Sequence, residues 1–203
     1  MRILGLDEAG RGCVLGPLVV GAFLYEGEDQ SPLRAAGADD SKVLSAARRA
    51  AALRRLQSLG QLRTLRVEPA EIDEGNLNEL EFTRFLDHVR FFAPDRVFLD
   101  APVNPRGIPK LKARMIRESG VNDWVIEPKA DATYPVVGAA SIAAKLERDA
   151  AIHALGEVGS GYPSDPVTRA LLSRLLASGE PLPPWVRARW GTIENLRQQA
   201  LFG

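Results

Sequence analysis

One short stretch near the start of the chain decides its fold, and it reads Ile3-Leu4-Gly5-Leu6-Asp7-Glu8-Ala9-Gly10-Arg11-Gly12. Its apolar residues predict a strand over residues 2–7, and its glycines permit a tight turn directly afterwards. Successive side chains of a strand point to opposite faces, so Asp7 and Glu8 face one site only if the backbone turns here. Two adjacent acids at the end of a buried strand are costly unless positive charge neutralises them. Arg11 supplies part of that charge, but a divalent metal ion supplies it better, because hard cations prefer carboxylate oxygens.

Composition describes a small globular chain with balanced charge. The 203 residues are 45% hydrophobic and carry 26 basic and 26 acidic side chains, so net charge neither indicates nor excludes a nucleic-acid partner. Cys13 is the single cysteine, which rules out an intrachain disulfide and fits a reducing cytoplasm. No apolar stretch reaches the ~20 residues of a membrane span, and no signal peptide is recognisable. We therefore expect a cytoplasmic monomer without a membrane segment.

Hydrophobic periodicity predicts a layered α/β core followed by a helical tail. Further strands are expected over residues 14–25, 62–67, 97–99 and 124–126. Helices are expected over residues 46–59, 77–92, 109–118, 139–155, 167–177 and 193–201, and the residues of 139–155 are small enough for close packing on a sheet. A loop is expected over 27–40. We expect a layered core over residues 1–155 and a helical region over residues 156–203.

Two further acids occupy positions comparable to that of Asp7. Asp100 follows the apolar strand 97–99, and sites in open α/β sheets form at the carboxyl ends of strands. Asp131 stands just before the long small-residue helix. Each acid has a plain explanation of its own, as part of an acidic loop tip, a strand terminator or a helix-entry residue. Four acids at strand ends and element starts are less easily explained in this way.

Ordered motifs along the chain resemble the type 2 ribonuclease H family, ribonuclease HII. They cover nearly the whole sequence and comprise residues 5–12, Asp40-Ser41-Lys42, 97–100, 130–137, 139–145, 148–149, 159–166 and 190–192. The first motif and the segment 130–137 are highly specific. The sequence of residues 159–166 is closer to the archaeal-like branch of the family than to the common bacterial branch. Cys13 departs from the proline that the family usually has after its Gly-Arg-Gly turn, and this frees a backbone N–H.

The resemblance implies an RNase H-like fold with a mixed five-stranded sheet flanked by helices. It implies that Asp7, Glu8, Asp100 and Asp131 are catalytic and hold two Mg²⁺ or Mn²⁺ ions. It also implies hydrolysis of RNA in RNA–DNA hybrids and incision 5′ of single ribonucleotides embedded in duplex DNA, leaving 3′-OH and 5′-phosphate ends. The chemistry suits these residues, because two metal ions can activate water and stabilise both the phosphate and the leaving alkoxide. No histidine lies in any of the motifs.

Choosing RNA over DNA requires groups that sense the 2′-OH. The backbone of Gly10-Arg11-Gly12 suits this role, because glycines let the main chain approach a sugar closely. By the resemblance, Tyr162 stacks on the deoxyribose at the RNA–DNA junction, although a plain turn aromatic in Gly-Tyr-Pro is the alternative. Lys42 is a candidate phosphate ligand or a solvated loop lysine. Lys145 is a candidate partner of Asp131 or of a phosphate.

Three other functions compete with this interpretation. Glycines 10, 12 and 16 after a strand superficially resemble a dinucleotide-binding turn, but Pro17 and a β-rich run follow where that motif needs a helix. A resolvase or transposase core is a second alternative, and the Tyr162 motif argues against it. A catalytically silent nucleic-acid-binding module is the third, and loss of one of the four acids would favour it.

The last residues predict a protein partner. The pattern Gln198-Gln199-Ala200-Leu201-Phe202 resembles the short peptides that bind DNA sliding clamps. Leu201 and Phe202 would anchor in an apolar pocket while Gln198 hydrogen-bonds at its rim. The alternative is an ordinary helix end whose two apolar side chains pack back on the core.

Overall fold

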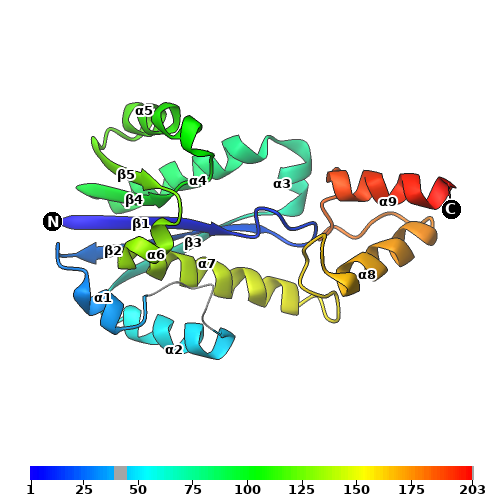
Figure 1. The fold of residues 1–203 in the computed structure, drawn as a ribbon, viewed down its shortest axis with the longest axis horizontal. Helices are drawn as coiled ribbons and strands as arrows, with labels where there is room; N and C mark the ends of the chain where they lie inside the picture. Colours follow the sequence, from blue (N-terminus) through cyan, green and yellow to red (C-terminus); the bar gives the residue numbers. More distant parts are fainter. Residues whose placement is uncertain (39–44, 203) are drawn as a thin grey trace.

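A five-stranded mixed sheet forms the centre of the computed structural model, which describes residues 1–38 and 45–202 (Figure 1). The strand order is β3-β2-β1-β4-β5. In sequence the strands are β1 (Arg2–Ala9), β2 (Leu18–Glu26), β3 (Gly60–Val67), β4 (Arg96–Asp100) and β5 (Asp123–Glu127). The pairs β1–β2 and β2–β3 are antiparallel, whereas β1–β4 and β4–β5 are parallel. The sheet confirms the predicted fold class.

Helices cover both faces of the sheet and extend beyond its end. One face carries α4 (Leu77–Phe92) and α5 (Ile108–Ser119), and the other carries α7 (Pro135–His153) with α2 (Ala46–Leu56) outside it (Figure 1). The remaining helical segments are α1 (Ser31–Ala35), α3 (Pro69–Glu74), the 3₁₀ turn η1 (Pro105–Gly107), α6 (Ala130–Thr133), α8 (Pro166–Ala177) and α9 (Gly191–Phe202). None of the described helices is both long and apolar enough to cross a bilayer.

Alternation along β1 sends apolar side chains into two separate cores. Leu4 and Leu6 join the core beneath α4 and α5, whereas Ile3 joins the core beneath α7. Two strand glycines let α7 approach closely. A Cβ at Gly5 would lie 2.1 Å from the Val136 carbonyl oxygen, and one at Gly21 would lie 2.4 Å from that of Ala140. The close packing predicted from the small residues of this helix is therefore confirmed.

A third core joins the helical tail to the end of the sheet. Its buried members come from the segment after β1, the end of α7 and the tail itself, and they are Val14, Leu15, Ile152, Val158, Leu172, Val186, Ile193 and Leu196. Leu15 also forms an isolated antiparallel bridge with Val186. The tail is thus fixed against the turn that follows β1, at the right-hand end of the sheet in Figure 1.

Several predicted boundaries are wrong for identifiable reasons. Strand β1 continues to Ala9, so both acids belong to the strand, and β2 begins at Leu18 rather than residue 14. The intervening segment turns instead, and the N–H of Val14 donates to the Gly161 carbonyl at 2.8 Å. Helix α7 begins at Pro135 rather than residue 139, because proline is favoured in the first turn of a helix. The short helix α1 lies within the predicted loop 27–40.

Candidate metal and nucleic-acid site

Three carboxylates converge where β1 and β4 end. Asp7 lies near the end of β1, Asp100 is the last residue of the neighbouring parallel strand β4, and Asp131 lies in α6 after β5. One oxygen from each lies within 4.8 Å of the others. The Ala130 N–H donates to Oδ1 of Asp100 at 3.0 Å, which fixes α6 against the end of β4. The predicted convergence of these three acids is therefore present in the structure.

Burial and mutual repulsion govern the charge of Asp7. Its side chain is buried, and burial raises its pKa to about 7, with a further upward contribution from the charge of Asp100. A hydrogen bond with Ser141 and the charge of Lys145 lower the pKa of Asp7. Lys145 donates to Oγ of Ser141 at 3.0 Å. Helix α7 therefore presents a hydroxyl and an ammonium group to this carboxylate.

Glu8 points to the opposite face of β1 and is not in the group of three. Because β1 is regular through both acids, their side chains alternate, and Glu8 lies near Glu81 of α4. Burial raises the pKa of Glu8 well above its usual value, and the charges of Asp7 and Glu81 add to this. The backbone does not turn between the two acids, because β1 continues to Ala9. Both nevertheless line one cleft, because that cleft lies at the end of the strand.

The donor set fits hard divalent cations. It consists of carboxylate oxygens, and the three converging acids place more negative charge together than Lys145 offsets. Oε2 of Glu8 is buried and has no hydrogen-bond partner in the described part of the chain. A carboxylate oxygen without a donor beside an acidic cluster is one that a metal ion satisfies. The residues present therefore fit Mg²⁺ or Mn²⁺.

The glycine turn is held from inside the protein by Arg187. This guanidinium is fully buried and donates to three backbone carbonyls, those of Gly10 at 2.7 Å, Arg11 at 3.1 Å and Gly16 at 3.1 Å. Gly10 has a φ of +86°, and a Cβ there would lie 2.7 Å from the Pro17 carbonyl oxygen, so only glycine fits. Sequence reasoning missed Arg187, whose only signal was a charge within an apolar segment.

The side chain of Arg11 is anchored on α4. It forms an ion pair with the buried Glu81 and a hydrogen bond with Oδ1 of Asn78. The predicted neutralising role is partly present, because the charge of Arg11 also lowers the pKa of Glu8. Its main partner, Glu81, was not predicted. The glycine turn is thus fixed both through its carbonyls and through its central side chain.

Tyr162 meets the glycine turn across the cleft. A Cβ at Gly12 would lie 3.9 Å from Cε1 of Tyr162, and the guanidinium of Arg148 lies 4.7 Å from the centre of the tyrosine ring. Tyr162 is 39% exposed as a residue. Cys13 is fully buried, and Arg148 donates to its Sγ at 2.8 Å. The thiol therefore lies behind the cleft rather than in it.

Asp7, Glu8, Asp100, the glycine turn and Tyr162 border one cleft of about 490 Å³. Its lining includes sequence-predicted residues together with others that the sequence did not indicate, and it consists of Asp7, Glu8, Ala9, Gly10, Arg11, Gly12, Arg49, Asp100, Lys145, Arg148, Asp149 and Tyr162. Arg49 pairs with Asp149 at 2.9 Å and closes one side. Lys42 falls within residues 39–44, outside the described residues, so its predicted role stays a prediction.

Comparison with known proteins decides the family. A family model described as ribonuclease HII matches residues 4–193. The chain belongs to the ribonuclease HII family. Ribonuclease HII of Archaeoglobus fulgidus is 40% identical over 97% of both chains, and that of Methanopyrus kandleri is 41% identical over 97% of this chain and 94% of its own. The protein is accordingly a type 2 ribonuclease H, an endoribonuclease, and the competing interpretations from the sequence are not favoured.

Solved structures agree with this assignment. The ribonuclease H2 of Pyrococcus horikoshii superposes with a TM-score of 0.89 at 35% identity over the whole of both chains. The ribonuclease HII in the PCNA complex from Archaeoglobus fulgidus superposes with a TM-score of 0.86 at 39% identity over 97% of both. A ribonuclease HIII solved with Mn²⁺ shares the fold, with a TM-score of 0.76 at 16% identity over 100% of this chain and 71% of that one.

Proposed function

We propose that this enzyme hydrolyses RNA in RNA–DNA hybrids and incises 5′ of single ribonucleotides embedded in duplex DNA. The observation that carries the proposal is one cleft that is lined both by Asp7 and Asp100 and by Gly12 and Tyr162. The two acids suit phosphodiester hydrolysis, and the glycine turn with Tyr162 suits recognition of a sugar. The products would carry 3′-OH and 5′-phosphate ends.

In this proposal Asp7, Glu8, Asp100 and Asp131 hold two Mg²⁺ or Mn²⁺ ions. When bound, such ions supply an activated water and stabilise charge on the phosphate and on the leaving oxygen. The protein orients its ligands through the bond from Ala130 to Asp100 and through the Ser141–Lys145 pair beside Asp7. Ribonucleases H depend on divalent metal ions, which supports this part of the proposal.

The same proposal assigns recognition of ribose to the turn Gly10-Arg11-Gly12 and recognition of the adjoining deoxyribose to Tyr162. Arg187 and Glu81 hold the turn before any substrate arrives, so its backbone is preorganised. Tyr162 comes from the helical region 156–203, which would therefore contribute to substrate binding beside the core 1–155. Lys42 would contact a phosphate.

We also propose a sliding clamp as a partner. The terminal pattern Gln198–Phe202 suits a clamp pocket, and α9, which contains it, ends at one extremity of the molecule (Figure 1). A relative 39% identical to this chain has been solved as a PCNA:RNase HII complex. Such a partner would bring the enzyme to newly made DNA, where misincorporated ribonucleotides arise.

One experiment tests the activity and its metal site together. A labelled DNA duplex with one embedded ribonucleotide is incubated with Mg²⁺ or Mn²⁺, and the cut is mapped for the wild type, Asp7→Asn and Asp100→Asn. We expect a single cut 5′ of the ribonucleotide, and a loss in both variants of several kcal/mol of transition-state stabilisation. Near wild-type turnover in either variant would contradict the four-carboxylate site. If the wild type leaves the duplex uncut at the ribonucleotide, the proposed substrate is wrong.

A further inference from the structure

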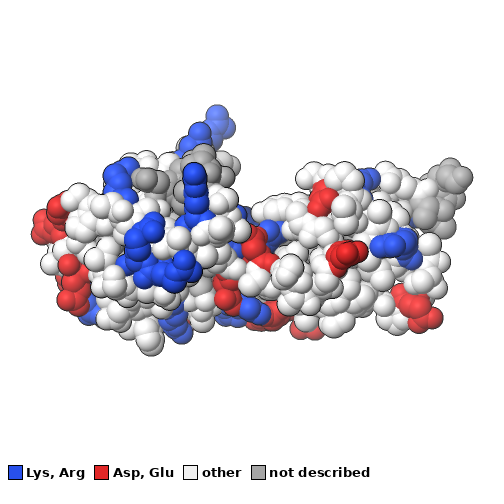
Figure 2. Space-filling model, turned by 90° about the horizontal axis from the view of Figure 1, so that it is seen from below, with Lys and Arg blue, Asp and Glu red and all other residues white. Residues whose placement is uncertain are grey.

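Helix α2 is the most one-sided charged element among those described. Its eleven residues include four arginines and no acid. Arg48, Arg54 and Arg55 are exposed, whereas Arg49 is half-buried in the catalytic cleft. Figure 2 shows basic side chains gathered over the lobe where Figure 1 places α1 and α2. In a chain whose formal net charge is zero, this is a local concentration of positive charge.

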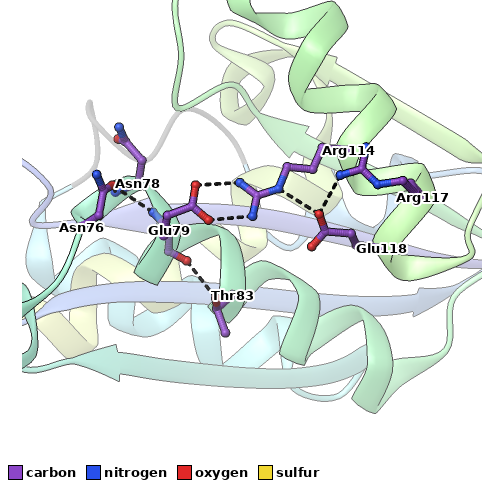
Figure 3. Close-up of polar contacts among 7 residues, drawn as sticks. All are labelled: Asn76, Asn78, Glu79, Thr83, Arg114, Arg117 and Glu118. Carbon is purple, nitrogen blue, oxygen red and sulfur yellow. Dashed lines mark hydrogen bonds and ion pairs between the residues drawn. The ribbon is translucent and has the colours of Figure 1, made fainter.

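The two arginines of α5, on the opposite side of the sheet, are paired with acids. Arg114 of α5 donates to both carboxylate oxygens of Glu79 at 2.7 and 2.6 Å and to Glu118 at 2.9 Å, and Arg117 also donates to Glu118 at 2.9 Å (Figure 3). Such pairs leave little positive charge for a partner.

No such pairing occurs on the exposed side of α2. Within the described ranges, Arg48, Arg54 and Arg55 form no ion pair with a carboxylate. The side chain of Arg55 donates instead to the Ala36 carbonyl at 3.0 Å. We name Arg48, Arg54 and Arg55 the α2 arginine surface. Among the described residues, no carboxylate pairs with this charge.

The helix that carries this surface also lines the cleft. Arg49 lines the cleft one residue after Arg48, and Arg54 and Arg55 lie in the last turn of the same helix. Arg55 lies six residue steps along the helix from Arg49, which corresponds to a rise of about 9 Å along the helix axis. That is the rise of about three base pairs of duplex. A duplex that is seated in the cleft and extends along α2 would therefore reach the level of Arg54 and Arg55 within about three base pairs of Arg49.

We propose that the α2 arginine surface binds the phosphate backbone of the substrate duplex outside the cleft. The inference rests on the proposed function, because that function places a duplex in the cleft. Guanidinium groups match phosphate oxygens in geometry and charge, and contacts to the backbone carry no sequence information. The surface thus supplies affinity and position for any sequence, which suits an enzyme whose target is defined by a sugar.

The test is the salt dependence of binding without cleavage. A duplex with one central ribonucleotide is titrated in EDTA with the wild type and with the triple variant Arg48→Gln/Arg54→Gln/Arg55→Gln. Each lost phosphate contact lowers the slope of log K against log salt by about 0.9. We expect the slope to fall by about 2 to 3 units and the Kd at low salt to rise roughly ten-fold or more. An all-DNA duplex should show the same fall.

A charge-matched control separates this surface from net charge. Arg90, Arg106 and Arg117 are exposed and lie beyond the other face of the sheet, so Arg90→Gln/Arg106→Gln/Arg117→Gln removes the same charge. An unchanged slope in the α2 variant, or an equal fall in the control, overturns the proposal. Circular dichroism and the Tm of each variant show whether it is folded. Failure of the wild type to cut the ribonucleotide duplex overturns the proposed function instead, and leaves the binding comparison interpretable.

Discussion

At the residue scale, the glycine turn depends on a group far away in the sequence. Arg187 is 0% exposed, and it forms no ion pair within the described part of the chain. Burial lowers its pKa to about 10, yet it remains charged at neutral pH and satisfies its N–H groups on main-chain carbonyls. A guanidinium can reach three carbonyls at once because its donors spread in a plane.

We predict that Arg187→Lys lowers both stability and ribose recognition. A lysine ammonium is a compact point charge that cannot span the carbonyls of Gly10, Arg11 and Gly16 together, so buried acceptors lose their donors. We expect a loss of about 2–4 kcal/mol in the free energy of unfolding, measured in urea. Where the variant is still folded, cleavage at a single ribonucleotide should also fall. Arg189→Lys is the control, because Arg189 is exposed; equal effects of the two would contradict the role of Arg187.

Tyr162 provides the second prediction at this scale. If its ring stacks on a deoxyribose, Tyr162→Ala should impair cutting at a single ribonucleotide in DNA more than cutting within a long hybrid. Tyr162→Phe keeps the ring and should retain both activities, since stacking needs the aromatic face rather than the hydroxyl. The ratio of kcat/KM on the two substrates is the measurement. Equal losses on both would indicate a structural turn aromatic instead.

Sequence and structure differ at this scale in an instructive way. Asp7 and Asp100 could be predicted, because each follows an apolar strand and neighbouring parallel strands end together. Glu81 and Arg187 could not, because their roles depend on contacts with partners 70 and more than 170 residues away. Nothing in a local pattern marks such a contact. The predicted end of the first strand was wrong for a different reason. The strand continues two residues beyond residue 7, where its apolar residues end, and it therefore includes Glu8.

At the element scale, α4 packs on the sheet, holds Arg11 of the glycine turn through Glu81, and carries a buried histidine. His88 is fully buried, and its Nε2 lies 3.2 Å from the Val20 carbonyl oxygen, so the neutral ring donates there. Burial lowers the pKa of His88 from 6.5 to about 4. Between these values the unfolded chain binds a proton that the folded chain does not. The stability supplied by the neutral ring is therefore full above pH 6.5 and is lost as the pH falls towards 4.

We predict that His88→Gln removes this pH dependence. The amide can still donate to the Val20 carbonyl but does not titrate, so the stability difference between wild type and variant should shrink by about 3 kcal/mol at most from pH 7 to pH 4.5. Urea unfolding at several pH values measures it, and comparing two proteins cancels the contributions of the other acids. His153 is exposed, so His153→Gln is the control. A difference independent of pH would show that His88 does not titrate as proposed.

The elements themselves were largely predictable from periodicity. Helix α4 matches its predicted range, because its apolar spacing and its Asn76 cap agree on where it begins. The predicted boundaries are wrong where tertiary contacts determine where an element begins. Strand β2 begins later than predicted because the N–H of Val14 donates a hydrogen bond to the Gly161 carbonyl. Helix α7 begins earlier than predicted because Pro135 starts the helix directly after α6. A single sequence does not state these contacts.

At the scale of the whole molecule, the acidic cleft and the proposed clamp-binding segment lie in different places. The cleft lies where the sheet meets the helical region, whereas α9 runs on to the C-terminal extremity (Figure 1). The helical region is fixed to the core through Arg187 and through the apolar cluster around Leu15 and Val186. A clamp that held the chain end would therefore hold the cleft in a defined position, while leaving it open to DNA.

We predict that Leu201→Ala/Phe202→Ala abolishes clamp binding and leaves cleavage of free duplex intact. Removing two apolar anchors costs a peptide–pocket contact about 2 kcal/mol or more, which is roughly thirty-fold in Kd. Calorimetry with the cognate clamp measures the loss, and cleavage of a clamp-free duplex measures the activity. Val167→Ala is the matched control, because Val167 is a 53% exposed apolar residue on the neighbouring helix α8. If the wild type shows no affinity for the clamp, or if the double variant unfolds, the two side chains belong to the core, and the terminal pattern is an ordinary helix end.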